Sequence, residues 1–285
     1  MAINITPTSA PLGAVITDLD VDNLTSEQER ELYDAWLQYG VLVFKRTVST
    51  HEHQMKLSRV FGETVIHPVE YMRIPEEPML IKLAANEGKP VADNDPTGDE
   101  LIGLIPWHAD LMYTDLPTRG SLLRAITIPE VGGDTGFIDT ARLYATLPKE
   151  IKARIQGVRI VHSYNKAHLA QNMVKGSSTL FPDVAHPLVY VHPDNGLPVL
   201  NISPTSAKKL IGPPEDEAAE LLDYLIKHAT REEEAYRHVW ELGDVVLWDN
   251  WRTMHRAYGH LKRHPRIMYR TTLKSEMRTG EYLAA

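Results

Sequence analysis

The sequence of 285 residues contains no cysteine. Disulfides, thiolate metal sites, cysteine nucleophiles and protein-ligated iron–sulfur clusters are therefore excluded. Any transition metal that this protein binds must be held by histidine and carboxylate side chains, and the chain has 13 histidines and 38 acidic residues to supply them.

The chain also lacks an excess of positive charge. Its net charge is −8, so the molecule as a whole does not present the basic field that nucleic acid or an anionic membrane attracts. No stretch approaches the roughly 18 apolar residues of a membrane span, and residues 1–15 lack the basic start and apolar run of a signal peptide. We therefore expect a cytoplasmic enzyme with no nucleic-acid or membrane partner.

The remaining composition is that of an ordinary globular protein, with 43% hydrophobic and 24% charged residues. The length allows one large core or two small domains. Near the N-terminus, apolar spacing predicts a helix over residues 25–38, capped by Thr25 or Ser26 and ended by Gly40. A buried strand over residues 41–44 and a second helix over 50–61 are expected to follow.

Residues 67–105 show little periodicity and are rich in proline, glycine, aspartate and asparagine. Long segments of this kind in compact domains are usually either functional or disordered. Because this segment runs directly into Trp107 and the residues discussed below, we favour a lid over a disordered insertion. A second flexible insert is expected around residues 165–185.

Most of the chain after this segment reads as short strands. Turn signals separate them, as at Gly132-Gly133-Asp134, and helices are predicted over residues 142–156 and 216–229. Such a pattern predicts a mainly β fold with flanking helices, a β-sandwich or jelly roll, and not alternating βαβ units. The predicted strands cover residues 121–127, 135–139, 158–162, 188–192, 245–248 and 267–273.

The candidate metal ligands are His108, Asp110 and His255. In an extended chain, residues two apart point to the same face, so His108 and Asp110 can bind one ion side by side. A histidine on a neighbouring strand, His255, can complete the set. Two histidines and one carboxylate leave open positions on the metal, as in non-haem Fe(II) oxygenases. The alternative is a histidine at a strand end that is merely hydrogen-bonded to a nearby aspartate.

Two arginines follow the third candidate ligand. In a strand, Arg266, Met268 and Arg270 share one face, so two guanidinium groups would point into one cavity. Like charges placed together are unfavourable unless anions lie between them, and arginine binds carboxylate or sulfonate through two hydrogen bonds. The alternative is that both arginines pair with acidic side chains.

Together these motifs resemble the taurine dioxygenase (TauD/TfdA) family, which includes the aryloxyacetate dioxygenases. The resemblance runs nearly from end to end, so we expect one domain over residues 1–285. The motifs that carry it are Arg59-Val60-Phe61-Gly62-Glu63, His67-Pro68-Val69, Trp107-His108-Ala109-Asp110, Gly132-Gly133-Asp134-Thr135 and the segment from Trp248-Asp249-Asn250 to Arg270.

The resemblance implies a double-stranded β-helix (jelly-roll) core and a dioxygenase that uses Fe(II), 2-oxoglutarate and O2. Position by position, it implies that His108, Asp110 and His255 bind iron, and that Arg266 and Thr135 bind 2-oxoglutarate. Arg270 and His67 match substrate-binding positions. Members of the family often form dimers or tetramers, so a homo-oligomer is expected. The presence of Asp110 favours hydroxylation over halogenation, because the related halogenases lack this carboxylate.

Two departures from the taurine enzyme bear on the substrate. An apolar run over residues 101–106 replaces a polar, asparagine-containing segment, and a taurine-binding tyrosine falls near Glu70, although the adjacent Tyr71 can substitute. An apolar lining favours a bulkier organic body behind the anion. We therefore expect a small carboxylate, sulfonate or sulfate ester, which hydroxylation can also cleave.

Two other classes of protein fit parts of the pattern. The first is a metal-dependent hydrolase or isomerase, because the same three ligands bind zinc. The second is a non-catalytic protein that binds small anions on the same barrel. A hydrolase would not need a 2-oxoglutarate site, so Arg266 together with Thr135 argues against it.

Overall fold

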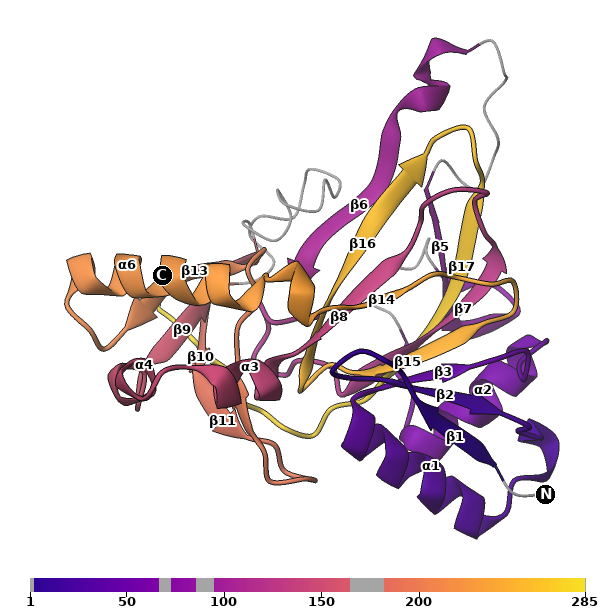
Figure 1. Cartoon of the computed structure of the whole chain (residues 1–285), viewed down its shortest axis with the longest axis horizontal. Coiled ribbons are helices and arrows are strands. Elements are labelled where there is room, and N and C mark those ends of the chain that lie inside the picture. The colour runs from indigo at the N-terminus through magenta and orange to yellow at the C-terminus, as the bar shows by residue number, and fades with distance from the viewer. Residues whose placement is uncertain (1–2, 67–72, 86–94, 165–181, 285) are drawn as a thin grey trace.

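The structure is a computed structural model that describes residues 3–66, 73–85, 95–164 and 182–284. Two β-sheets occupy its centre (Figure 1). The larger sheet contains, in the order of hydrogen-bonded neighbours, β1 (Asn4–Pro7), β2 (Ala14–Thr17), β3 (Val41–Phe44), β15 (Val245–Asp249), β7 (Gly120–Thr127), β17 (Arg266–Leu273), β5 (Glu77–Ala85) and β4 (Arg73–Ile74).

The smaller sheet is antiparallel and lies opposite the larger one. Alternate residues of both sheets meet in one buried cluster, in which Val246 and Trp248 of the larger sheet pack with Phe137 of the smaller. This alternation is the period of two expected of a strand with one face in a core. The strands of the smaller sheet are, in order, β14 (Tyr236–His238), β8 (Thr135–Asp139), β16 (Thr253–Leu261) and β6 (Leu101–His108).

Two helices, α1 (Ser26–Tyr39) and α2 (His51–Phe61), cover the outer face of the larger sheet (Figure 1). Thr25 and Gln28 form a capping box that starts α1, and Gly40 ends it with a left-handed φ of 72°. The residues between those of the inner cluster, such as Leu247 of β15, pack against these helices. The central strands β3 and β15 of the larger sheet are therefore buried on both faces.

A third layer covers the outer face of the smaller sheet, where Ile138 and Met254 pack into a second large cluster. In the described residues, the layer holds a four-stranded sheet, a two-stranded sheet and the helices α3, α4 and α6 (Figure 1). Its elements are β9 (Arg159–His162), β10 (Val184–Pro187), β11 (Val189–Val191), β12 (Pro198–Leu200), β13 (Ala207–Ile211), β18 (Glu281–Tyr282), α3 (Thr140–Thr146), α4 (Lys149–Arg154) and α6 (Glu215–Ala229).

The expected class, mainly β with flanking helices, is confirmed, with 37% strand and 26% helix. Short 3-10 helices occur at η1 (Val21–Asn23), η4 (Pro96–Asp99) and η5 (Glu232–Glu234). No helix in the described parts of the chain combines the length and the apolar character that a membrane crossing requires.

The single helix predicted over residues 142–156 was wrong. Two helices, α3 and α4, occupy this stretch and are separated at Leu147 and Pro148. Proline disfavours helical geometry in the residue before it, and Leu147 has an extended ψ of 142°. The remaining predicted helices and strands are present, with ends that shift by at most one residue.

The segment 67–105 is not a long structureless loop in its described parts. It contains β5, which pairs with β17, and most of β6, which pairs with β16. The proline- and glycine-rich composition obscured two strands that have partners far away in the sequence. Residues 67–72 and 86–94, and 165–181 of the second expected insert, lie outside the described residues. The lid therefore stays a prediction.

Candidate metal centre

The structure brings His108, Asp110 and His255 together between β6 and β16. His108 and His255 face each other in the register of these strands, with ring centroids 4.1 Å apart. The Asp110 carboxylate lies 3.8 Å from Nε2 of His108 and 3.7 Å from Nε2 of His255. One potential ligand atom from each of the three residues lies within 4.8 Å of the other two. Such a set suits one cation that keeps open coordination positions.

Hydrogen bonding and burial leave these side chains in metal-binding forms. His108 Nδ1 lies 2.8 Å from the Pro106 carbonyl oxygen, an acceptor only, so Nδ1 carries the proton and Nε2 offers its lone pair. Burial lowers the pKa of both His108 and His255, which keeps them neutral. Burial alone would raise the pKa of Asp110, but Arg270 and the two histidine rings together lower it, and the carboxyl is ionised.

Asn250 holds the backbone on both sides of Asp110. Its side-chain oxygen accepts a hydrogen bond of 2.7 Å from the Asp110 amide, and its NH2 group donates to the Asp110 and Thr118 carbonyls. The next residue, Leu111, has a left-handed φ of 56°, which is uncommon for a residue other than glycine. The sequence contains Asn250 in the Trp248-Asp249-Asn250 motif, but nothing in its spacing reveals this contact across 140 positions.

Asp249, the residue before Asn250, stabilises the turn between β15 and β16. Asp249 is fully buried, and it accepts hydrogen bonds from Arg119 and, at 3.0 Å, from His192. The Arg119 guanidinium also lies over the Trp36 and Trp251 rings, 4.0 and 4.3 Å from their centroids. Sequence reasoning missed Arg119 and His192, because neither lies near the motif in the chain.

Arg266 is the first residue of β17, and Thr135 is the first residue of β8, whose Phe137 lies opposite His255. Burial lowers the pKa of Arg266 to about 10, and its Nε is buried without a hydrogen-bond partner. A Cβ at Gly133 would lie 3.2 Å from Arg266 Cδ, and Gly133 has a φ of 77°, so both space and backbone favour glycine there. The buried Thr135 hydroxyl accepts a hydrogen bond of 3.0 Å from the Trp240 indole. Arg266 is therefore a cation with a free donor that an anion could accept from.

Arg270 points toward the three candidate ligands. Its guanidinium donates to Asp110 Oδ2 at 2.6 Å and to Ser121 Oγ at 2.8 Å. In the described structure Arg270 is therefore paired with an acidic side chain, as the alternative interpretation held, whereas Arg266 makes no ion pair with any described residue. Tyr113 lies close enough for the Asp110 charge, together with burial, to raise its pKa. His67 and Tyr71, the other predicted substrate contacts, lie outside the described residues.

A model of one protein family matches residues 4–272 of the chain. Its description is "Taurine catabolism dioxygenase TauD, TfdA family". The chain belongs to this family. The resemblance seen in the sequence is thereby confirmed over almost its whole length.

Individual members of the TauD/TfdA family are similar to this chain over nearly its whole length. The chain is 31% identical to an (S)-phenoxypropionate/alpha-ketoglutarate-dioxygenase of Sphingobium herbicidovorans, over 99% of each protein. It is 27% identical to an alpha-ketoglutarate-dependent sulfate ester dioxygenase of Pseudomonas putida, over 98% of this chain and 92% of that protein.

Two solved structures are similar in fold. A putative alpha-ketoglutarate-dependent taurine dioxygenase from Burkholderia xenovorans has a TM-score of 0.81 and 28% identity, over 100% of this chain and 96% of the other. AAD-2, solved in complex with Mn(II) and N-oxalylglycine, has a TM-score of 0.80 and 30% identity, over 98% of this chain and 99% of the other. The jelly-roll core expected from the sequence is confirmed by these similarities.

TauD/TfdA enzymes use Fe(II), 2-oxoglutarate and O2, and this chain is a 2-oxoglutarate-dependent dioxygenase. Its residues fit both groups. Two neutral histidines and one carboxylate are the donor set of non-haem Fe(II). The buried Nε of Arg266, which has no partner, is a donor that a co-substrate carboxylate would satisfy.

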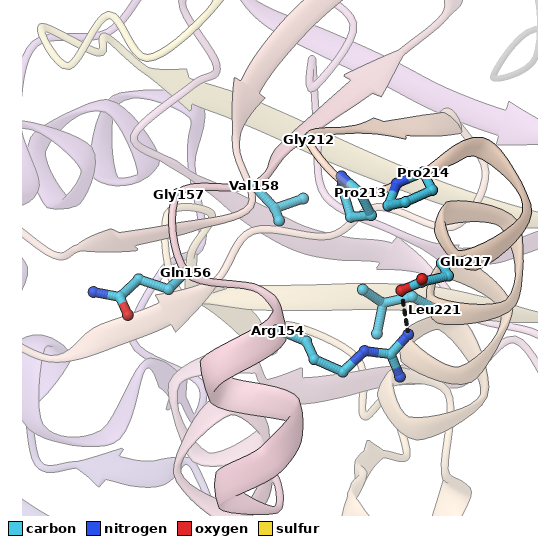
Figure 2. Close-up of a pocket in the computed structure, with 9 residues that line it drawn as sticks. All are labelled: Arg154, Gln156, Gly157, Val158, Gly212, Pro213, Pro214, Glu217 and Leu221. Atoms are coloured by element: carbon cyan, nitrogen blue, oxygen red, sulfur yellow. Dashed lines mark ion pairs between the residues drawn. The ribbon is translucent and has the colours of Figure 1, made fainter.

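A separate pocket of about 340 Å³ lies between the end of α4 and the start of α6 (Figure 2). Arg154 and Glu217 line it and form an ion pair of 3.8 Å. Its described lining contains no histidine, and Arg154 neutralises its one carboxylate. The pocket shares no residue with the TauD/TfdA motifs and offers no metal-binding set.

Proposed function

We propose that His108, Asp110 and His255 hold Fe(II) in this enzyme, and that it hydroxylates a small organic anion with an apolar body. The observation that carries the metal assignment is the convergence of three ligand atoms within 4.8 Å. The bond from His108 Nδ1 to the Pro106 carbonyl, which directs Nε2 to the same point, supports it further. An iron held by these three residues, with 2-oxoglutarate, would supply the activation of O2, by which one oxygen atom enters a substrate C–H bond and the other enters succinate, with release of CO2.

The co-substrate site is assigned to Arg266 and Thr135. The Thr135 hydroxyl and the Arg266 Nε are buried, and Arg266 makes no ion pair with any described residue. A guanidinium whose Nε is buried without a hydrogen-bond partner is stabilised when an anion accepts from it. A dicarboxylate provides that anion at one end and leaves its keto acid end for the metal. A zinc hydrolase would have no use for this cation.

The substrate anion is assigned to Arg270, together with His67 and Tyr71. Arg270 lies within reach of the metal centre, because it donates to Asp110 Oδ2 at 2.6 Å. Ser121 supports the guanidinium from the other side. The apolar run over residues 101–106 leads along β6 into His108, and its Leu104 keeps 42% of its surface exposed. The relatives that act on phenoxypropionate and on sulfate esters use anions of this type.

A substrate panel tests this assignment. Succinate formation above the substrate-free rate is expected with phenoxyalkanoates, alkyl sulfates or apolar sulfonates, and to a smaller extent or not at all with taurine. Arg270→Gln should lower kcat/KM by about 100-fold, because a charge-assisted hydrogen bond contributes roughly 1.5–3 kcal/mol and truncation adds a desolvation cost.

The control is Arg263→Gln, in the turn before Arg266, where the arginine pairs with the exposed Asp99. It should leave kcat/KM unchanged. Equal activity of the Arg270 variant and this control would contradict the assignment. Taurine as the best substrate of the panel would contradict the proposed apolar body.

We also infer a cytoplasmic homo-oligomer, a dimer or tetramer. Family membership supports the oligomer, and the need for reduced iron together with the absence of cysteine suits a reducing compartment. Light scattering on the purified protein tests the first, with a mass near 32.2 kDa contradicting it. Cell fractionation tests the second.

A further inference from the structure

Trp240 is a buried residue that belongs to none of the sequence motifs described above. It lies in the loop between β14 and β15, is 7% exposed, and packs in the inner cluster with Phe137 and Trp248. Its indole Nε1–H donates a hydrogen bond of 3.0 Å to the Thr135 hydroxyl. Trp240 thus contacts a residue of the proposed co-substrate site without belonging to any recognised motif.

The chemistry of the two groups fixes the direction of this bond. An indole N–H is a donor only, so the threonine oxygen must accept. The hydroxyl has a single proton, which it keeps for another acceptor. No acceptor for that proton is recorded among the described residues, and Thr135 is only 4% exposed. The buried Nε of Arg266 likewise has no partner. Two donors therefore lack acceptors in the described structure, and the Arg266 side chain lies beside Gly133, two residues before Thr135.

Packing fixes the position of the indole. The His238 ring meets it edge to face, with centroids 4.6 Å apart and an interplanar angle of 86°. His238 in turn lies 3.1 Å from the buried Asp244 carboxylate, which also pairs with Lys45 at 2.9 Å. This chain of contacts leaves the indole little freedom to turn away from Thr135.

We propose that Trp240 is a positioning residue for 2-oxoglutarate: its indole N–H occupies the acceptor side of the Thr135 hydroxyl and thereby directs the hydroxyl proton toward the co-substrate carboxylate. This inference rests on the proposed co-substrate site. Without the indole, the hydroxyl can rotate and lose its preorganised donor geometry. Binding of 2-oxoglutarate then weakens, while the metal ligands are unaffected.

The test is an anaerobic titration of the Fe(II) enzyme with 2-oxoglutarate, followed by the visible absorption of the chelate. Trp240→Phe should raise the Kd for 2-oxoglutarate about tenfold, the effect of losing one well-placed hydrogen bond to a charged group. Fe(II) affinity should be unchanged, and kcat at saturating 2-oxoglutarate should stay within about twofold. Replacing Trp240 with benzothienylalanine, which keeps the ring shape and lacks the N–H, should do the same if the phenylalanine variant folds poorly.

A double-mutant cycle separates positioning from packing. In a Thr135→Val background, Trp240→Phe should have no further effect on the Kd, because the hydroxyl through which it acts is gone. The matched control is Trp36→Phe. This substitution likewise removes a buried indole N–H, but one that has no hydrogen-bond partner in the described ranges and lies on the outer face of the larger sheet. It should leave the Kd unchanged.

Three results would overturn the proposal. One is a Kd within twofold of wild type in both Trp240 variants. Another is an equal loss with and without the Thr135 hydroxyl, which would make Trp240 a packing residue. The third is an unchanged Kd in Arg266→Ala, which would remove the co-substrate site itself, whereas the first two leave that site intact.

Discussion

Each of the three candidate iron ligands is held in a different way. A backbone carbonyl fixes His108. Asp110 is held by Arg270 and by two hydrogen bonds between the Asn250 side chain and the Asp110 backbone, which we call the Asn250 clamp. His255 packs between Phe137 and Trp248, and its Nδ1 is buried without a hydrogen-bond partner. The sequence indicated His108 and Asp110 as candidates, because residues two apart in a strand share a face, and the structure brings His255 to them. The groups that hold them lie far away in the chain and could not be predicted from spacing.

The Asn250 clamp should be necessary for tight metal binding. Asn250→Ala removes the contacts on both sides of Asp110, and loss of a group that orients a ligand typically weakens metal affinity by about 10–100-fold. A competition titration with a chelator, using Mn(II) or Fe(II) without O2, measures this. Asn195→Ala is the control, because Asn195 donates to the Leu37 carbonyl away from the site. Equal affinities in the two variants would contradict the role of the clamp.

A buried histidine outside the site should make stability depend on pH. Burial lowers the pKa of His186 from 6.5 to about 4. Between these values the unfolded chain binds a proton and the folded protein does not, so the free energy of unfolding falls as the pH falls through this window. Lowering the pH from 7 to 5 should reduce the free energy of unfolding by about 2 kcal/mol through His186 alone. Above pH 7 this histidine should not change the free energy of unfolding.

Urea denaturation at pH 7 and pH 5 measures this effect. His186→Gln should lose about 2 kcal/mol less than the wild type over this interval. Gln156→Ala, an exposed substitution that removes no titratable group, should follow the wild type. Parallel pH profiles for wild type and His186→Gln would show that His186 is not neutral in the folded protein.

At the scale of whole elements, local signals decided what the sequence could predict. Helix α1 has a cap, a periodic apolar face and a glycine end, and its predicted and observed bounds differ by one residue at each end. Strand β6 has none of these. Its apolar run does not alternate, and it pairs with β16 about 150 positions later, so only tertiary contacts define it.

The capping box of α1 offers a direct test of an element. Thr25→Ala removes the side-chain acceptor for the Gln28 amide and should lower the free energy of unfolding by about 1 kcal/mol. Urea denaturation of the apoprotein measures the loss. Ser26→Ala, one residue further and inside the first turn, should cost less than about 0.5 kcal/mol. Similar costs for the two variants would argue against the capping box.

At the scale of the whole molecule, the site depends on the closure of two sheets. Its residues come from β6, β8, β16 and β17, which lie in two different sheets around one buried cluster. Strand patterns in the sequence indicated a sandwich but not its strand order, because pairings between strands more than 100 positions apart leave no local signal. The order could be anticipated only through the resemblance to a known family.

The central claim is that the metal and co-substrate sites operate together at these residues. Fe(II) and 2-oxoglutarate added to the purified protein without O2 should give the weak visible band of a chelate at an iron held by two histidines and a carboxylate. The band should be absent in His108→Ala, and in Arg266→Ala it should form only at much higher 2-oxoglutarate concentration, whereas His53→Ala should behave as wild type. A folded protein that gives no band, or an Arg266→Ala variant that titrates like the wild type, would contradict this account.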